Sequence, residues 1–152
     1  MRAPRAVAVE LARLLRGEID VRDFPWLDPT ERRALGALGM SMLEAGRAGD
    51  AQAAFSVLAD LEPEHPLHHL MMGHASALAD EVSEAFKAFG RAIRLSAQDP
   101  EARAVAREAF LARGDLLLRL GRVVQARADL ADAAERMDDP ARRSSIEAFL
   151  AG

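Results

Sequence analysis

The chain has 152 residues, of which half are hydrophobic, 5% aromatic and 29% charged, and its net charge is −4. Arginines and acidic residues are interspersed, which argues against the concentrated basic face that nucleic-acid binding needs, and the absence of cysteine excludes disulfides and thiol chemistry. No apolar run reaches membrane-spanning length and none resembles a signal peptide, so we expect one cytoplasmic domain that does not insert into a membrane.

The first expected element is an amphipathic N-terminal helix that ends near Gly17. Its apolar residues recur at helical spacing and are Val7, Leu11, Leu14 and Leu15. The segment from Asp23 to Leu27 follows as an apolar loop. Within it, Trp26 either fastens the loop to the next helix or anchors a partner, and the sequence leaves both interpretations open.

A fixed spacing of small and bulky residues then recurs three times. In each copy a glycine is followed 12 residues later by an alanine, and four residues after that by a bulky apolar residue. The three sets are Gly39, Ala51 and Phe55; Gly73, Ala85 and Phe89; and Gly114, Ala126 and Leu130. Small residues allow two helices to cross closely, and the bulky residue fills the space beside them. The spacing therefore predicts three helix pairs that stack to bury their apolar faces.

Caps and turns mark where the helices begin and end. Three helix starts combine an acidic N-cap with a proline in the first turn: Asp28-Pro29, Asp99-Pro100 and Asp139-Pro140. The second start predicts a helix from Pro100 to Leu120, because seven extra residues separate the second and third copies. The last start predicts a short helix with Ile146, Phe149 and Leu150 on one face. Turns within the pairs are expected at Gly46, Asp80 and Gly121. Glycine readily adopts the left-handed backbone that ends a helix, whereas aspartate tolerates it less well.

The first copy fits a 34-residue helix-turn-helix unit, Arg32 to His65, and resembles a tetratricopeptide repeat (TPR). The residues at the family's signature positions are Leu35, Leu38, Gly39, Met42, Ala51, Phe55, Leu58 and Pro63. The second copy departs from the family pattern at His69 and Ser76, and the third closes with Pro140, two residues late. The resemblance implies an all-α fold, a TPR superhelix of three repeats with an N-terminal helix and a short C-terminal capping helix. The segments of this single domain are residues 1–28 (N-terminal helix and linker), 32–65, 66–99 and 100–139 (the repeats) and 140–152 (C-terminal helix).

In the TPR family the first helices of the repeats build a concave groove that binds peptides. The residues expected to line this groove are Met40, Leu43, Leu67, Leu70, Met71, His74, Leu78, Leu111, Asp115 and Leu118. Apolar, methionine-bearing grooves suit peptide segments with apolar anchors, because methionine packs adaptably against different partners. An alternative is that Leu67, Leu70 and Leu78 are covered by other helices or by a second copy of the chain, and belong to a core.

The sequence contains little that could support catalysis or metal binding. The one dense group of potential metal ligands is His65, His68, His69 and His74. Pro66 should start a helix after His65, and His68 and His69 should diverge by about 100° on that helix. No nucleophile, base and orienting group occur together. We therefore expect no enzyme activity, no cofactor and no metal site.

The size and layout are similar to those of the class II chaperones of bacterial type III secretion, which hold translocator proteins before export. The similarity is clearest from Leu35 to Pro63 and from Gly114 to Leu130. It implies that the groove holds a translocator segment and that the N-terminal segment supports a homodimer. This chain, however, has no tyrosine, whereas the family's groove is rich in Tyr and Phe. The alternative is a general TPR adaptor or scaffold subunit in a bacterial multiprotein assembly.

Overall fold

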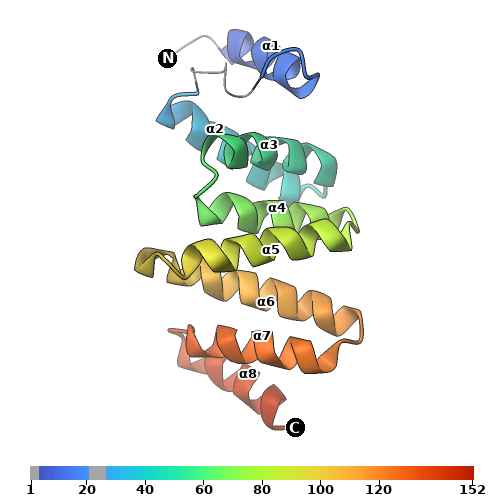
Figure 1. The fold of residues 1–152 in the computed structure, drawn as a ribbon, viewed down its shortest axis with the longest axis vertical. Coiled ribbons are helices and arrows are strands. Elements are labelled where there is room, and N and C mark those ends of the chain that lie inside the picture. The colour runs from blue at the N-terminus through green and yellow to red at the C-terminus, as the bar shows by residue number, and fades with distance from the viewer. Residues whose placement is uncertain (1–3, 21–26) are drawn as a thin grey trace.

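The structure, a computed structural model, describes residues 4–20 and 27–152. In these ranges the chain forms α-helices and one 3₁₀ turn but no strand, which confirms the predicted all-α fold (Figure 1). The elements are α1 (Pro4–Leu15), α2 (Pro29–Glu44), α3 (Ala48–Leu61), α4 (Pro66–Leu78), α5 (Val82–Ser96), η2 (Pro100–Ala102), α6 (Arg103–Arg119), α7 (Val123–Glu135) and α8 (Pro140–Ala151). None of these helices is both long and apolar enough to cross a membrane. Trp26 and the side chains of Val7 and Leu11 lie outside the described residues.

The helices follow one another along the long axis of the molecule in chain order (Figure 1). From α2 to α8 each α-helix packs against the next, and α2, α4 and α6 also touch one another in turn. The first helices of the three pairs therefore form one continuous layer. This layer carries the candidate site.

The recurring glycines lie directly against the bulky residues of the second helices. A Cβ atom at Gly39 would be 2.8 Å from the Phe55 ring, and one at Gly73 would be 2.4 Å from the Phe89 ring. In the third pair the corresponding distance, from Gly114 to Leu130, would be 3.2 Å. The paired alanines Ala51, Ala85 and Ala126 are all fully buried. The predicted close helix crossings are thus present in all three pairs.

The turns inside the three pairs share one backbone conformation. Gly46, Asp80 and Gly121 have φ angles of 73°, 61° and 71°, in the left-handed region. The residue after each of them donates its amide to a carbonyl five residues back, which closes the end of the first helix. Asp80 adopts this conformation although its side chain makes it less favourable than it is for glycine.

The helix starts use the expected caps, with one difference. Asp28 accepts hydrogen bonds from the amides of Thr30 and Glu31, and the Glu31 side chain accepts from the Asp28 amide, forming a capping box. The helix predicted over 100–120 instead begins with the 3₁₀ turn η2. The amide of Ala102 bonds to the carbonyl of Asp99, three residues back, and this tighter pairing delays the α-helix to Arg103.

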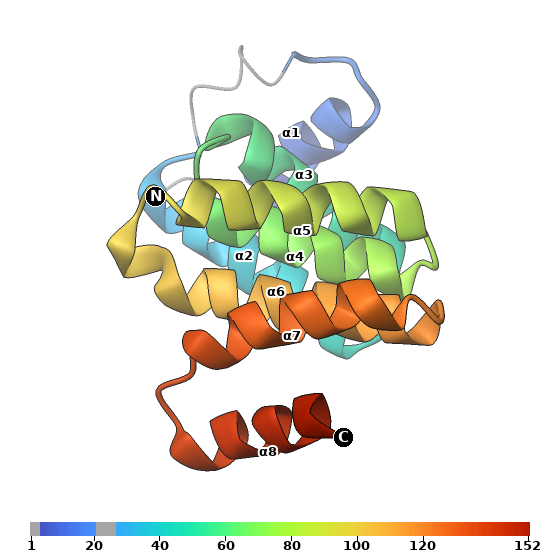
Figure 2. The same ribbon diagram turned by 60° about the horizontal axis from the view of Figure 1, so that its bottom comes forward.

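The C-terminal helix α8 packs on α7 at the end of the stack (Figure 2). Arg127 on α7 donates a hydrogen bond to the carbonyl of Leu150. No residue of α8 is fully buried, and Phe149, expected on its packed face, is 48% exposed. The predicted capping helix therefore forms, but its apolar stripe covers α7 only in part.

Candidate functional site

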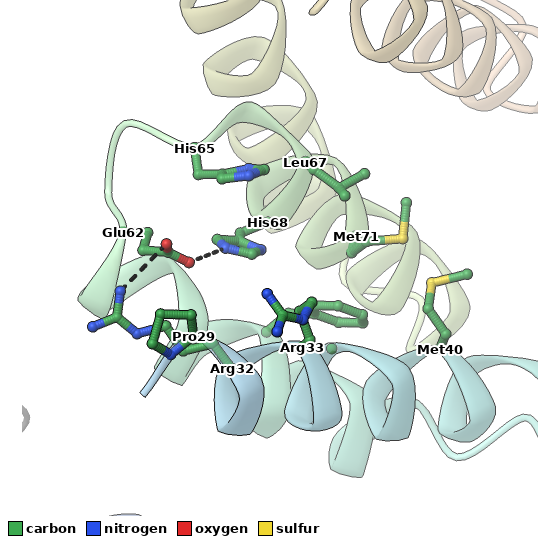
Figure 3. A pocket seen from close by; sticks show the side chains of 11 residues that line it. Pro29, Arg32, Arg33, Met40, Glu62, His65, Leu67, His68 and Met71 are labelled. Atoms are coloured by element: carbon green, nitrogen blue, oxygen red, sulfur yellow. Dashed lines mark hydrogen bonds and ion pairs between the residues drawn. The ribbon is translucent and has the colours of Figure 1, made fainter. Parts of the chain in front are cut away.

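A hollow of about 560 Å³ opens between α2, α4 and the end of α3. Figure 3 shows it from close by, with α2 on one side and α4 on the other. It is lined by Pro29, Arg32, Arg33, Gly36, Met40, Phe55, Glu62, His65, Leu67, His68 and Met71. The residues of α2 that line it recur every three or four positions, so one face of this helix forms the wall.

The inner part of the hollow is apolar. Met40 on α2 and Leu67 on α4 are 41% and 40% exposed, and Met71 is half-buried between the core and the opening. Phe55 lies beneath them and is almost fully buried. Gly36 also lines the hollow, and a Cβ added there would be in ordinary contact with Leu58, at 3.7 Å. The result is an apolar surface with two flexible methionines, open to solvent.

A connected polar group closes one end of the hollow. Nε2 of His68 lies 2.8 Å from a Glu62 carboxylate oxygen, and the other Glu62 oxygen is 3.4 Å from Arg32 (Figure 3). Nε of Arg32 also donates to the carbonyl of Leu27 at 2.8 Å. The His65 ring stacks on the His68 ring, with 4.3 Å between their centroids. Glu62 thus holds side chains from α2 and α4 together.

Burial and hydrogen bonding set the ionisation of this group. Burial lowers the pKa of His68, and the charge of His65 lowers it further, while the hydrogen bond to Glu62 opposes both. Burial acts to raise the pKa of Glu62, but the hydrogen bond from His68 and the charges of His68, Arg32 and His65 together hold this pKa below its usual value. The surroundings thus favour the neutral form of the His68 ring and the ionised form of the Glu62 carboxylate.

Arg33 is exposed and supplies a positive charge beside the hollow, which also acts on the nearby Asp28 carboxylate. It projects from α2 toward the hollow (Figure 3). Its guanidinium donates to the Thr30 hydroxyl at 3.3 Å. Across residues 4–20 and 27–152, no carboxylate forms an ion pair with it, whereas the neighbouring Arg32 is paired with Glu62.

A second hollow, of about 430 Å³, adjoins the first and extends toward α6. The two share His65 and Leu67 as lining residues. The other lining residues of the second hollow are Glu64, Pro66, Asp99, Glu101, Ala102 and Val105. The two hollows therefore adjoin at His65 and Leu67, and together, as the depression, they extend past α2, α4 and the start of α6.

Three of the residues predicted to line the groove lie in this depression, namely Met40, Leu67 and Met71. Leu43, His74, Leu111 and Leu118 are half-buried, while Leu78 and Asp115 are exposed; all six lie outside both hollows. The prediction was wrong for Leu70, which is 3% exposed and packs in the core with Ala85 and Phe89. Its position on α4 faces the second helix of its own pair.

Sequence reasoning missed the polar end of the hollow. Glu62 belongs to the linker between two helix pairs, and the expected site contained only residues of the first helices. The signal available in the sequence was the segment from Glu62 to His68, in which charged and histidine residues surround two prolines. Such a short linker brings its side chains back beside the helix that follows it.

The four histidines do not converge. His65 and His68 stack, Nε2 of His69 pairs with the carbonyl of Pro63, and His74 meets the Phe89 ring edge-on at 5.4 Å. Burial lowers the pKa of His74, although the charge of Glu108 opposes this. In the part of the chain that the structure describes, no three His, Asp or Glu residues are grouped so as to hold a metal ion.

The depression combines apolar surface with a positive end, which suits binding of a peptide by packing and charge. No protein-family model matches the chain, and neither does any curated protein or solved structure.

Proposed function

We propose that this protein is a non-catalytic binding module, a TPR superhelix of three repeats, that holds an apolar segment of a partner protein. The observation that carries the proposal is the open hollow in which Met40 and Leu67 are partly exposed on two adjacent first helices. Exposed apolar side chains that line a concave surface are typical of sites that another molecule covers. The repeated glycine contacts and left-handed turns support the TPR part of the proposal.

Selection of peptides tests this function. Random twelve-residue peptides displayed on phage are selected on the immobilised full-length protein, and the binding of single synthetic peptides is then measured by fluorescence anisotropy. We expect selected peptides to share apolar anchors. Met40→Glu and Leu67→Glu should weaken their binding at least tenfold, because each places a charge on the apolar surface of the hollow.

A matched control exists on the same helix. Leu38 is 47% exposed on α2 but does not line the hollow, so Leu38→Glu should leave both the helical content and peptide affinity unchanged. Circular dichroism establishes that all three variants are folded. If Leu38→Glu weakens binding as much as Met40→Glu does, the hollow is not the binding site.

A narrower proposal is that the partner is a secreted translocator and that the protein is its cytoplasmic type III secretion chaperone. The supporting observation is α1, in which Leu14 is buried against the stack while Val9 and Leu15 remain exposed. A short helix with apolar residues on its outer side can be covered by a second copy of the chain.

Removal of residues 1–17 separates this narrower proposal from a monomeric TPR adaptor. For a chaperone dimer, light scattering should show the full chain as a dimer and the truncated chain as a monomer that retains its helices. For an adaptor, both chains should be monomers, and the truncated chain should melt at a lower temperature because Leu14 is lost from the core. A monomeric full-length chain at high concentration contradicts the dimer but leaves peptide binding untouched.

A further inference from the structure

The charges along the depression change sign from one end to the other. In the hollow between α2 and α4, two arginines lie with one glutamate. This end is therefore positive, on a chain whose net charge is −4. In the adjoining hollow, the charged lining residues are the carboxylates Glu64, Asp99 and Glu101.

Several of these charges are not neutralised within the protein. Among the described residues, the Arg33 guanidinium hydrogen-bonds only to the Thr30 hydroxyl and forms no ion pair, although its charge also acts on Asp28. The Asp99 carboxylate accepts only from the backbone amide of Glu101 there. Glu64 is paired with Arg91, which lies outside both linings. In the described ranges, no basic side chain forms an ion pair with Glu101. Each end of the depression thus presents at least one charge that a bound molecule could pair with.

Apolar side chains line the depression between its two charged ends. Leu67 belongs to both hollows, with Met40 and Met71 on the positive side and Val105 on the negative side. A molecule that follows this path crosses α2, α4 and α6, which touch in turn. Neighbouring helix axes are about 10 Å apart, so the path is roughly 20 Å long. An extended peptide covers that length with about six residues, at about 3.3 Å each.

We infer that the depression binds an extended apolar segment of a partner protein that carries an acidic side chain at one end and a basic side chain about six residues away. The acidic side chain pairs with Arg33, and the basic one pairs with Glu101 and its neighbouring carboxylates. The apolar residues between them pack on Met40, Leu67 and Met71. This inference rests on the proposed function and specifies the chemistry of the partner.

The charge pattern of selected peptides tests the inference. Peptides selected on the wild-type protein should carry an acidic and a basic residue about six positions apart, on either side of apolar residues. Selection on Arg33→Glu should replace the acidic residue by a basic one. In solution, replacing the acidic residue of the peptide by the corresponding amide residue (Asp by Asn, or Glu by Gln) should weaken binding to the wild-type protein about fivefold. The same replacement should weaken binding to the Arg33→Gln variant less than twofold. Arg142→Gln, an exposed arginine on α8, is the control and should behave like the wild type.

The outcomes separate this inference from the function on which it rests. Apolar peptides selected without any charge pattern would overturn the inference alone, since the hollow would still bind peptides. A pattern that persists unchanged on Arg33→Glu would overturn the assignment of the acidic residue to Arg33. Selection of no peptide at all would contradict both the inference and the proposed function.

Discussion

The ring of Phe89 occupies the space beside Gly73 so closely that a methyl group added to this glycine would lie 2.4 Å from a ring atom. Gly73 is buried in α4 and Phe89 in α5, so this contact sets how closely the two helices of the central pair approach. The other two pairs have the same relationship, between Gly39 and Phe55 and between Gly114 and Leu130.

We predict that Gly73→Ala destabilises the fold by roughly 1–3 kcal/mol, because the added methyl forces the Phe89 ring or the helix to move. Gly49→Ala is the matched control, since nothing lies within 4 Å of a Cβ at that helical position. It should leave stability unchanged or raise it by up to about 1 kcal/mol. Urea unfolding followed by circular dichroism measures both. Equal losses of stability in the two variants would contradict the packing described for Gly73.

The turn at Asp80 offers a stabilising substitution. Asp80→Gly should raise the free energy of unfolding by about 0.5–1 kcal/mol, because glycine adopts a φ of 61° without steric cost. Gly121→Ala should have the opposite effect at the equivalent turn, where φ is 71°. Both changes are measured as shifts in the urea midpoint. A lower midpoint for Asp80→Gly would show that the aspartate side chain stabilises the turn in another way.

The third helix pair is joined by an ion pair from Arg113 to Asp129, with two hydrogen bonds of 2.7 and 2.8 Å. The carboxylate is buried, so Asp129→Asn should lower the free energy of unfolding by roughly 1.5–3 kcal/mol, because Arg113 loses its charged acceptor. Asp115→Asn breaks the exposed ion pair with Arg119 and should cost less than about 1 kcal/mol. Thermal melts of the two variants compare these costs. If the two variants have the same melting temperature, the buried ion pair stabilises the fold no more than the exposed one does.

Stability should fall as the pH is lowered from about 7 to about 5. Burial lowers the pKa of His68 and of His74 in the folded state, so the unfolded chain, with ordinary histidine pKa values near 6.5, binds more protons in this range. The stabilisation is present above pH 6.5 and is lost as the pH falls toward the lowered pKa values. Replacing both histidines by glutamine should flatten this part of the curve. Urea unfolding at several pH values measures it, and a wild-type curve that is already flat would contradict the assignment.

The helix crossings and helix starts that the sequence predicted depended mostly on the positions of glycine, alanine and proline. Gly73 and Ala85 predicted a close crossing because only small residues permit it, and Asp28-Pro29 predicted a helix start because its cap is local. Leu70 was misplaced, because it lies only about 60° around α4 from Leu67 and about 100° from Met71, and the core and groove faces of that helix are both apolar. Glu62 and His68 could not be paired from the sequence, because their contact depends on how a linker folds back against the next helix.

The stacking of each helix on its immediate neighbours also bears on how the chain folds. Its contacts join segments that are close in sequence, so little loop-closure entropy is lost before they form, and such topologies fold quickly. The two ends of the stack have neighbours on one side only, and no residue of α8 is fully buried. Amide hydrogens in α8 should therefore exchange with solvent through local fraying, while those in α4 and α5 exchange only when the whole domain opens.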